Sequence, residues 1–205
     1  MRYMKRIAVI ASGRGSNFQA VIDRVSDGYI PGTCVRLITD NPHAFAIERA
    51  RNAGIPVSIV DFTSFPDKKE YEAALLAAME ECEADLFILA GYMRILGQEI
   101  VRRYSGCMMN IHPALLPSFS GLHAQRQALD YGVKVAGCTV HFVDEGMDTG
   151  PIIIQRCVSV CADDDEERLS IRILQEEHAA LPEAVKLFCE DRLTIEGRKA
   201  RILPP

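Results

Sequence analysis

Short apolar runs alternate with longer segments of helical spacing through the first half of the chain. Residues 6–11 form an apolar run rich in β-branched residues, which predicts a buried strand. Apolar residues then recur at helical spacing after position 17, and Gly28 ends that helix. The same order continues with strands expected at residues 34–39, 56–60 and 85–90 and helices at residues 44–53 and 67–82. This alternation predicts βαβ units and a Rossmann-like, mostly parallel α/β sheet with helices on both faces.

The second half has a different pattern. Residues 135–143 and 152–160 alternate apolar and polar positions, which predicts an antiparallel pair at the sheet edge in the C-terminal half. Pro182 lies inside a helical stretch and predicts a kink or a restart. The remaining expected elements are a short strand at 107–111, helices at 124–131 and 166–189, and a hairpin at 193–205.

Length and composition favour one soluble globular domain. The 205 residues exceed about 150 residues per domain only modestly, and 48% are apolar against 25% charged. We expect a single domain over residues 1–205. Its first half, residues 1–105, would bind an anion, and its second half, residues 106–205, would contain the catalytic residues.

Charge and cysteine usage narrow the class of protein further. The formal charge of −5, without a Lys/Arg run longer than two, argues against nucleic-acid binding. The seven cysteines are odd in number and contain no Cys-x-x-Cys pair, which predicts free thiols in a reducing compartment. The opening residues show no leader pattern, and the apolar stretch at 7–11 is too short to cross a membrane, so a cytoplasmic protein is expected.

The turn from Ser12 to Asn17 (SGRGSN) connects the first strand to the first helix. Its backbone N–H groups and the helix dipole form an anion site, to which Ser16 and Asn17 add side-chain donors. The dinucleotide fingerprint Gly-x-Gly-x-x-Gly fails because Phe18 replaces the third glycine, so a monophosphate is the expected ligand. The alternative is a glycine turn in which Ser16 or Asn17 caps the helix and nothing binds.

Asn110 and His112 stand two apart at the carboxyl end of the short strand. Such residues point to the same side, so an amide donor and an imidazole can share one small volume. This pair suits stabilisation of an oxyanion with proton transfer. The alternative is a satisfied loop histidine beside an asparagine that caps a turn.

The acidic segment from Asp144 to Gly150 is a solvated turn or a loop that brings a carboxylate to His112, where it would favour the imidazolium. The remaining histidines show no metal-ligand spacing, so no metal is expected.

Together these motifs resemble the phosphoribosylglycinamide formyltransferases, folate-dependent enzymes of purine biosynthesis. The resemblance covers about residues 5–200 and rests on five segments: ASGRGSN (11–17), LAGYMRIL (89–96), NIHPALLPSF (110–119), GLHAQRQAL (121–129) and DTGPIIIQ (148–155). It implies the formyltransferase fold and transfer of the formyl group of 10-formyltetrahydrofolate to the amine of phosphoribosylglycinamide. The partners implied are these two small molecules, with the protein acting as a monomer or homodimer.

The resemblance also implies roles for individual residues. Asn110 would stabilise the oxyanion, His112 would transfer the proton, and Asp148 would raise the pKa of His112. Lys68 departs from the family pattern, which has arginine there, and it keeps the charge without the planar fork. The implied ligand contacts are Gly15, Ser16 and Asn17 for the phosphate, Glu177 for the ribonucleotide, and Lys68, Met93, Arg94, Ile95, Leu96, Asn110, Asp144, Glu145, Gly146 and Met147 for the folate.

Three other functions fit part of the pattern. A formyltetrahydrofolate deformylase shares the catalytic core but carries an extra N-terminal domain. A methionyl-tRNA formyltransferase shares Asn-x-His-Pro but needs a basic C-terminal domain. A nucleotide-sensing α/β module would use the glycine turn alone, which leaves Asn110, His112 and Asp148 without a role.

Overall fold

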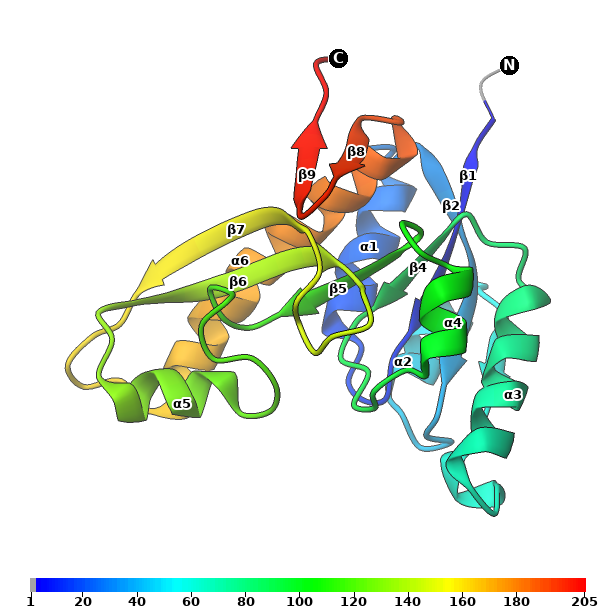
Figure 1. The fold of residues 1–205 in the computed structure, drawn as a ribbon, viewed down its shortest axis with the longest axis horizontal. Helices are drawn as coiled ribbons and strands as arrows, with labels where there is room; N and C mark the ends of the chain where they lie inside the picture. The colour runs from blue at the N-terminus through cyan, green and yellow to red at the C-terminus, as the bar shows by residue number, and fades with distance from the viewer. Residues whose placement is uncertain (1–2) are drawn as a thin grey trace.

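A computed structural model describes residues 3–205 as a nine-stranded sheet with helices on both faces (Figure 1). The expectation about the opening residues falls partly on residues 1–2, which lie outside the described residues. The strands are β1 Lys5–Ile10, β2 Gly32–Thr39, β3 Val57–Ile59, β4 Leu86–Leu89, β5 Met108–His112, β6 Val135–Phe142, β7 Ile152–Ser159, β8 Leu193–Glu196 and β9 Lys199–Ile202. The helices are α1 Ser16–Ser26, α2 Ala46–Asn52, α3 Lys68–Glu80, α4 Gln98–Arg103, α5 Ala124–Tyr131 and α6 Glu166–Cys189, with a 3-10 turn η1 at Phe62–Ser64.

The first five strands form the parallel part of the sheet, in the order β3-β2-β1-β4-β5. The direction of strand succession reverses between β1 and β4, and ligands of such sheets bind outside the carboxyl ends at this point. The loops that follow these two strands are joined there. The Ser12 N–H donates to the Gly91 carbonyl at 3.2 Å, and the Met93 N–H donates to Ser12 Oγ at 3.1 Å.

The antiparallel part of the sheet lies in the C-terminal half, as predicted. β6 runs antiparallel to β5 and to β7, and the predicted hairpin is present as β8 and β9. The β6–β7 pair is nevertheless not the outermost, because β9 adds to β7 in parallel and places β8 at the edge.

Two apolar cores fill the space between the sheet and its helices. Alternate residues of β1 point to opposite faces, so Ile7 and Val9 join the core under α1, α2 and α6, while Ala8 and Ile10 join the core under α3 and α4. Figure 1 shows α6 crossing behind β6 and β7. Within residues 3–205 we find no helix that combines the length and the apolar character needed to span a bilayer.

Helices α4 and α6 differ from the sequence-based expectation, and the 3-10 turn η1 was not predicted either. Helix α4 was not predicted, because its six residues contain only Ile100 and Val101 as buried positions and show no clear periodicity. Helix α6 passes through Pro182 without a restart. Proline removes one intrahelical hydrogen bond, but Leu181 and Val185 on either side are fully buried and hold the helix on the sheet.

Candidate active site

Strands β5 and β6 place four polar side chains on one face of the sheet. Asn110 and His112 alternate along β5, and the antiparallel register sets His141 opposite Asn110 and Thr139 opposite His112. Thr139 is fully buried; its hydroxyl donates to the Ala114 carbonyl at 2.7 Å and accepts from the Leu116 N–H at 3.1 Å. This pair of hydrogen bonds fixes the loop that leaves His112.

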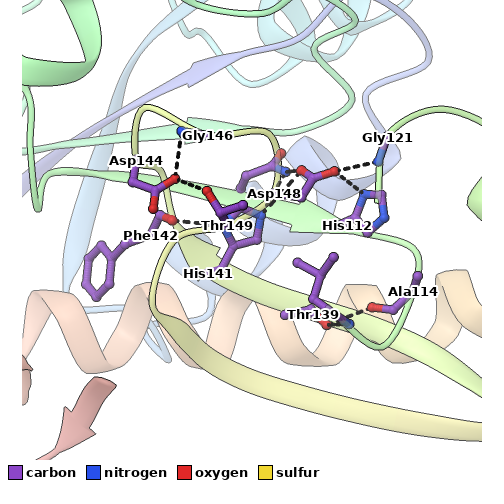
Figure 2. Close-up of polar contacts among 12 residues, drawn as sticks. His112, Ala114, Gly121, Thr139, His141, Phe142, Asp144, Gly146, Asp148 and Thr149 are labelled. Atoms are coloured by element: carbon purple, nitrogen blue, oxygen red, sulfur yellow. Dashed lines mark hydrogen bonds and ion pairs between the residues drawn. The ribbon is translucent and has the colours of Figure 1, made fainter. Parts of the chain in front are cut away.

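Asp148 reaches this face from the loop between β6 and β7 (Figure 2). Its Oδ2 lies 3.4 Å from His112 Nδ1, and its Oδ1 lies 3.4 Å from Asn110 Nδ2. The Gly121 N–H donates to Oδ2 at 2.8 Å. Asp148 has a φ of 54°, a left-handed conformation that non-glycine residues rarely adopt. The structure thus brings together the amide, the imidazole and the carboxylate that the sequence singled out.

The Asp148 carboxylate stays ionised in this setting. Burial by itself raises its pKa, but the hydrogen bond from the Gly121 N–H and the neighbouring His112 ring act in the opposite direction and hold the pKa below its usual value. The side chain is only 13% exposed, so it presents a fixed negative charge to His112.

Both ring nitrogens of His112 face oxygen atoms. Nε2 is 2.8 Å from the Phe119 carbonyl oxygen, and Nδ1 faces Asp148. A carbonyl oxygen only accepts hydrogen bonds, so Nε2 carries a proton. The Asp148 carboxylate lies beside Nδ1, and an imidazole ring can donate a proton to a substrate oxygen or nitrogen.

The glycine turn leaves the amino end of α1 without a side-chain cap. Gly15 occupies the N-cap position at φ 66°, and no side chain there accepts from the first N–H groups. The alternative in which Ser16 or Asn17 caps the helix is therefore wrong. A Cβ atom at Gly15 would lie 2.8 Å from the Ala46 Cβ, so only glycine fits. The turn offers free N–H groups and the positive helix end to an anion.

Asn17 is joined to Glu177, 160 positions later in the chain. The Asn17 Nδ2 donates to Glu177 Oε2 at 2.7 Å, and both side chains are buried. Burial raises the pKa of Glu177, although the hydrogen bond from Asn17 acts in the opposite direction. The predicted phosphate and ribonucleotide contacts thus lie side by side, which the sequence alone did not show.

The loop after β4 carries the predicted folate-lining segment Met93 to Leu96. Met93 and Ile95 are 66% and 62% exposed, whereas Arg94 Nε donates to the buried carboxylate of Asp40 at 2.6 Å. The Arg94 guanidinium also lies 3.5 Å from the centre of the Phe62 ring. These contacts hold the loop and leave its apolar side chains open to a flat ligand.

The other predicted folate contacts lie apart from one another. In the 144–147 loop, Asp144 accepts from the Gly146 N–H and the Thr149 hydroxyl, and Glu145 forms an ion pair with Arg102 of α4. Lys68 begins α3 and pairs with Glu72 of the same helix at 3.3 Å. Within residues 3–205, Lys68 forms no ion pair with another predicted site residue.

A cavity of about 570 Å³ opens beside Asp148. Apolar walls come from Leu116, Pro117 and Met147, and the 198–201 segment of the C-terminal hairpin closes another side. Residues 93–96 do not line it. The cavity therefore reaches the Asp148 carboxylate without including the whole predicted folate surface.

His141 belongs to this cluster, although the sequence analysis assigned it no role. Its Nε2 is 3.2 Å from Asn110 Nδ2 and 3.7 Å from Asp148 Oδ1. Thr139 and His141 alternate along a predicted strand, and this pattern of two polar residues on an otherwise apolar strand was the available signal. Among residues 3–205 no cluster of three or more His, Cys, Asp or Glu side chains is arranged to hold a metal ion.

Similarities to known proteins extend over almost the whole chain. Residues 5–185 match the formyl transferase family. The phosphoribosylglycinamide formyltransferase of Bacillus subtilis (strain 168) is 43% identical over 183 residues, which cover 89% of this chain and 94% of that protein. The trifunctional purine biosynthetic protein adenosine-3 of Drosophila melanogaster is 45% identical over 90% of this chain, which spans only 14% of that protein.

Solved structures give the same picture. Glycinamide ribonucleotide transformylase 1 from Symbiobacterium toebii superposes with a TM-score of 0.96 at 49% identity, covering 98% of this chain and 95% of that one. A formyltetrahydrofolate deformylase from Pseudomonas syringae pv. tomato superposes with a TM-score of 0.92 but is 28% identical, and the chain covers 67% of it.

Proposed function

The chain belongs to the formyl transferase family, and we propose that it transfers the formyl group of 10-formyltetrahydrofolate to the amine of phosphoribosylglycinamide, a step of purine biosynthesis. The observation that carries this proposal is the convergence of Asn110 and His112 on Asp148, each at 3.4 Å, at the carboxyl edge of the sheet. Formyl transfer needs these three chemistries at one carbonyl.

The reaction assigns one task to each residue. The amine lone pair forms a C–N bond to the formyl carbon, and the carbonyl electron pair moves onto oxygen. Asn110 donates an N–H to this oxyanion, and Asp148 keeps His112 protonated beside it. Collapse of the adduct breaks the bond to the folate nitrogen. As that bond breaks, the protonated His112 gives its proton to the folate nitrogen, and the neutral ring that remains takes the proton that the amine loses.

We assign the two substrates to two groups of residues. We assign the phosphate to the uncapped turn at Gly15, Ser16 and Asn17, and the ribonucleotide to Glu177. This assignment is supported by the free N–H groups of α1 and by the Asn17–Glu177 hydrogen bond. We assign the folate to Lys68, Asn110, residues 93–96 and residues 144–147; the exposed apolar side chains of Met93, Ile95 and Met147 support a flat ligand there.

We further propose that residues 1–205 form a single domain, with the phosphate half at 1–105 and the catalytic and folate half at 106–205. Small molecules are its expected partners, and the protein acts as a monomer or homodimer. A cytoplasmic location is supported by seven free thiols, since a reducing compartment keeps thiols in this state.

A spectroscopic folate assay tests the function. Formyl loss from 10-formyltetrahydrofolate should require phosphoribosylglycinamide and yield one formylated ribonucleotide for each tetrahydrofolate. Equal loss into water without the ribonucleotide would identify a deformylase instead. No loss under either condition would favour a nucleotide-sensing module.

A further inference from the structure

We propose that His141 is a positioning residue, which fixes the direction of the Asn110 carboxamide so that its N–H end faces the reacting carbonyl. This inference rests on the formyl transfer proposed above. It follows from the hydrogen bonds around His141, which lie among the residues drawn in Figure 2.

The backbone brings the two side chains together before any hydrogen bond forms. Asn110 of β5 and His141 of β6 are direct partners in the antiparallel register, so both side chains leave the same face of the sheet. The His141 side chain is only 3% exposed, so its ring nitrogens are satisfied by protein groups.

The backbone also decides which nitrogen of His141 carries the proton. Nδ1 lies 2.8 Å from the Phe142 carbonyl oxygen, which can only accept a hydrogen bond. Nδ1 is therefore the donor. In the neutral ring Nε2 then keeps its lone pair, and this lone pair faces Asn110 Nδ2 at 3.2 Å. The 3.7 Å between Nε2 and Asp148 Oδ1 is too long for a hydrogen bond.

The lone pair on Nε2 orients the amide. One N–H of Asn110 Nδ2 donates to His141, and the second N–H points toward Asp148 Oδ1 at 3.4 Å. An amide turned by half a rotation would set its oxygen against both the lone pair and the carboxylate, which is repulsive. The second N–H is thus held on the side of Asp148 and His112, where the proposed reaction places the oxyanion.

Two substitutions separate the acceptor at Nε2 from the donor at Nδ1. The glutamine Oε1 lies as many bonds from Cα as Nε2 does, so His141→Gln can restore an acceptor for Asn110. The asparagine Nδ2 matches Nδ1 in the same way, so His141→Asn keeps the donor to Phe142 and loses that acceptor. If His141 has a purely structural role, His141→Asn should be the more active variant. If His141 orients Asn110, His141→Gln should be the more active one.

For His141→Asn we expect kcat to fall about 10- to 1000-fold, and the upper limit equals the rate loss when one oxyanion-hole donor is removed. KM for both substrates should stay within about threefold of wild type. His141→Gln should recover most of that loss. His43→Leu is the matched control, because this exposed histidine lies outside the site, and it should keep full activity. Wild-type kcat in His141→Asn, or a folded His141→Gln no better than His141→Asn, would overturn the proposal.

A second measurement needs neither variant nor turnover. ¹⁵N NMR of the histidine-labelled wild-type protein at neutral pH should show His141 as the neutral ring with its proton on Nδ1. A proton on Nε2, alone or in the imidazolium, would overturn the proposal. If the wild type lacked transferase activity while His141 showed the expected tautomer, the proposed function would fail and the orientation of Asn110 would stand.

Discussion

In the proposed reaction, Asn110 and His112 act on the same oxyanion. Asn110 offers a hydrogen bond only to the oxygen, whereas His112 also moves a proton. The Asp148 carboxylate lies 3.4 Å from Asn110 Nδ2 and 3.4 Å from His112 Nδ1, so a change at one side chain alters the surroundings of the other. Their effects are therefore coupled, and removing both should cost less than the product of the single losses.

Substituting either residue by alanine should lower kcat by about 100- to 1000-fold, the usual cost of one oxyanion-hole donor. Steady-state kinetics of Asn110→Ala and His112→Ala measure this, with circular dichroism as the control for folding. Near wild-type turnover in a folded variant would remove that residue from the mechanism.

Glu177 is a buried carboxyl whose pKa is raised by burial. The folded state therefore holds the proton more tightly than the unfolded chain does. The stability that this group contributes is complete below its unfolded pKa of about 4.3 and is lost as pH rises through the folded pKa. In addition, the Asn17 Oδ1 has no hydrogen-bond partner within the described part of the chain.

Glu177→Gln should therefore raise Tm at neutral pH, since glutamine is uncharged and can donate to Asn17 Oδ1. The gain over wild type should shrink as pH falls toward 4, and each kcal/mol corresponds to about 2–4 °C for a chain of this size. Thermal unfolding at several pH values measures it. The neighbouring Glu176, 36% exposed, provides the control as Glu176→Gln. A destabilised or pH-independent Glu177→Gln would contradict the argument.

At the scale of the element, the loop between β6 and β7 is held from several sides. The Asp144 carboxylate accepts two hydrogen bonds within the loop, Glu145 pairs with Arg102, and Arg198 of the hairpin donates to the Thr149 carbonyl at 3.1 Å. The chain passes close to β6 at Gly150, where an added Cβ would lie 1.8 Å from the Phe142 carbonyl oxygen.

Gly150→Ala should push this loop away from β6 and displace Asp148. We expect a loss of about 1–3 kcal/mol in stability, as for other overpacked sites, together with a large fall in kcat. Thermal unfolding and kinetics of the same variant measure both. Gly13→Ala, where the new Cβ meets nothing within 4 Å, should leave Tm nearly unchanged; equal effects of the two substitutions would exclude the steric explanation.

Patterns local in sequence predicted the elements well, because each strand and helix has its own periodicity. They did not predict α4, whose two buried residues give no period. The partner of Asn110 was also out of reach, since the register between β5 and β6 depends on packing across the sheet. Likewise, the motif residues Asn17 and Glu177 were recognised separately, and only the fold shows that they touch.

At the scale of the whole molecule, one sheet connects the two halves of the chain. β4 and β5 pair across the boundary between residues 1–105 and 106–205, and one apolar core contains both Phe18 of α1 and Leu181 of α6. Neither half can bury its own apolar face alone, so the proposed single domain should behave as one cooperative unit.

We expect a single unfolding transition with equal calorimetric and van't Hoff enthalpies. Differential scanning calorimetry measures both, and circular dichroism should give the same midpoint. Two resolved transitions would instead show that the halves fold independently.

The hydrogen bond between Asn17 and Glu177 closes a loop that spans most of the chain. Contacts of such large sequence separation form late, because the entropy of bringing distant segments together is lost before the contact stabilises anything. During synthesis or refolding, the proposed ribonucleotide site must therefore wait for α6 to dock, and a nascent chain that lacks its last quarter should not bind phosphoribosylglycinamide.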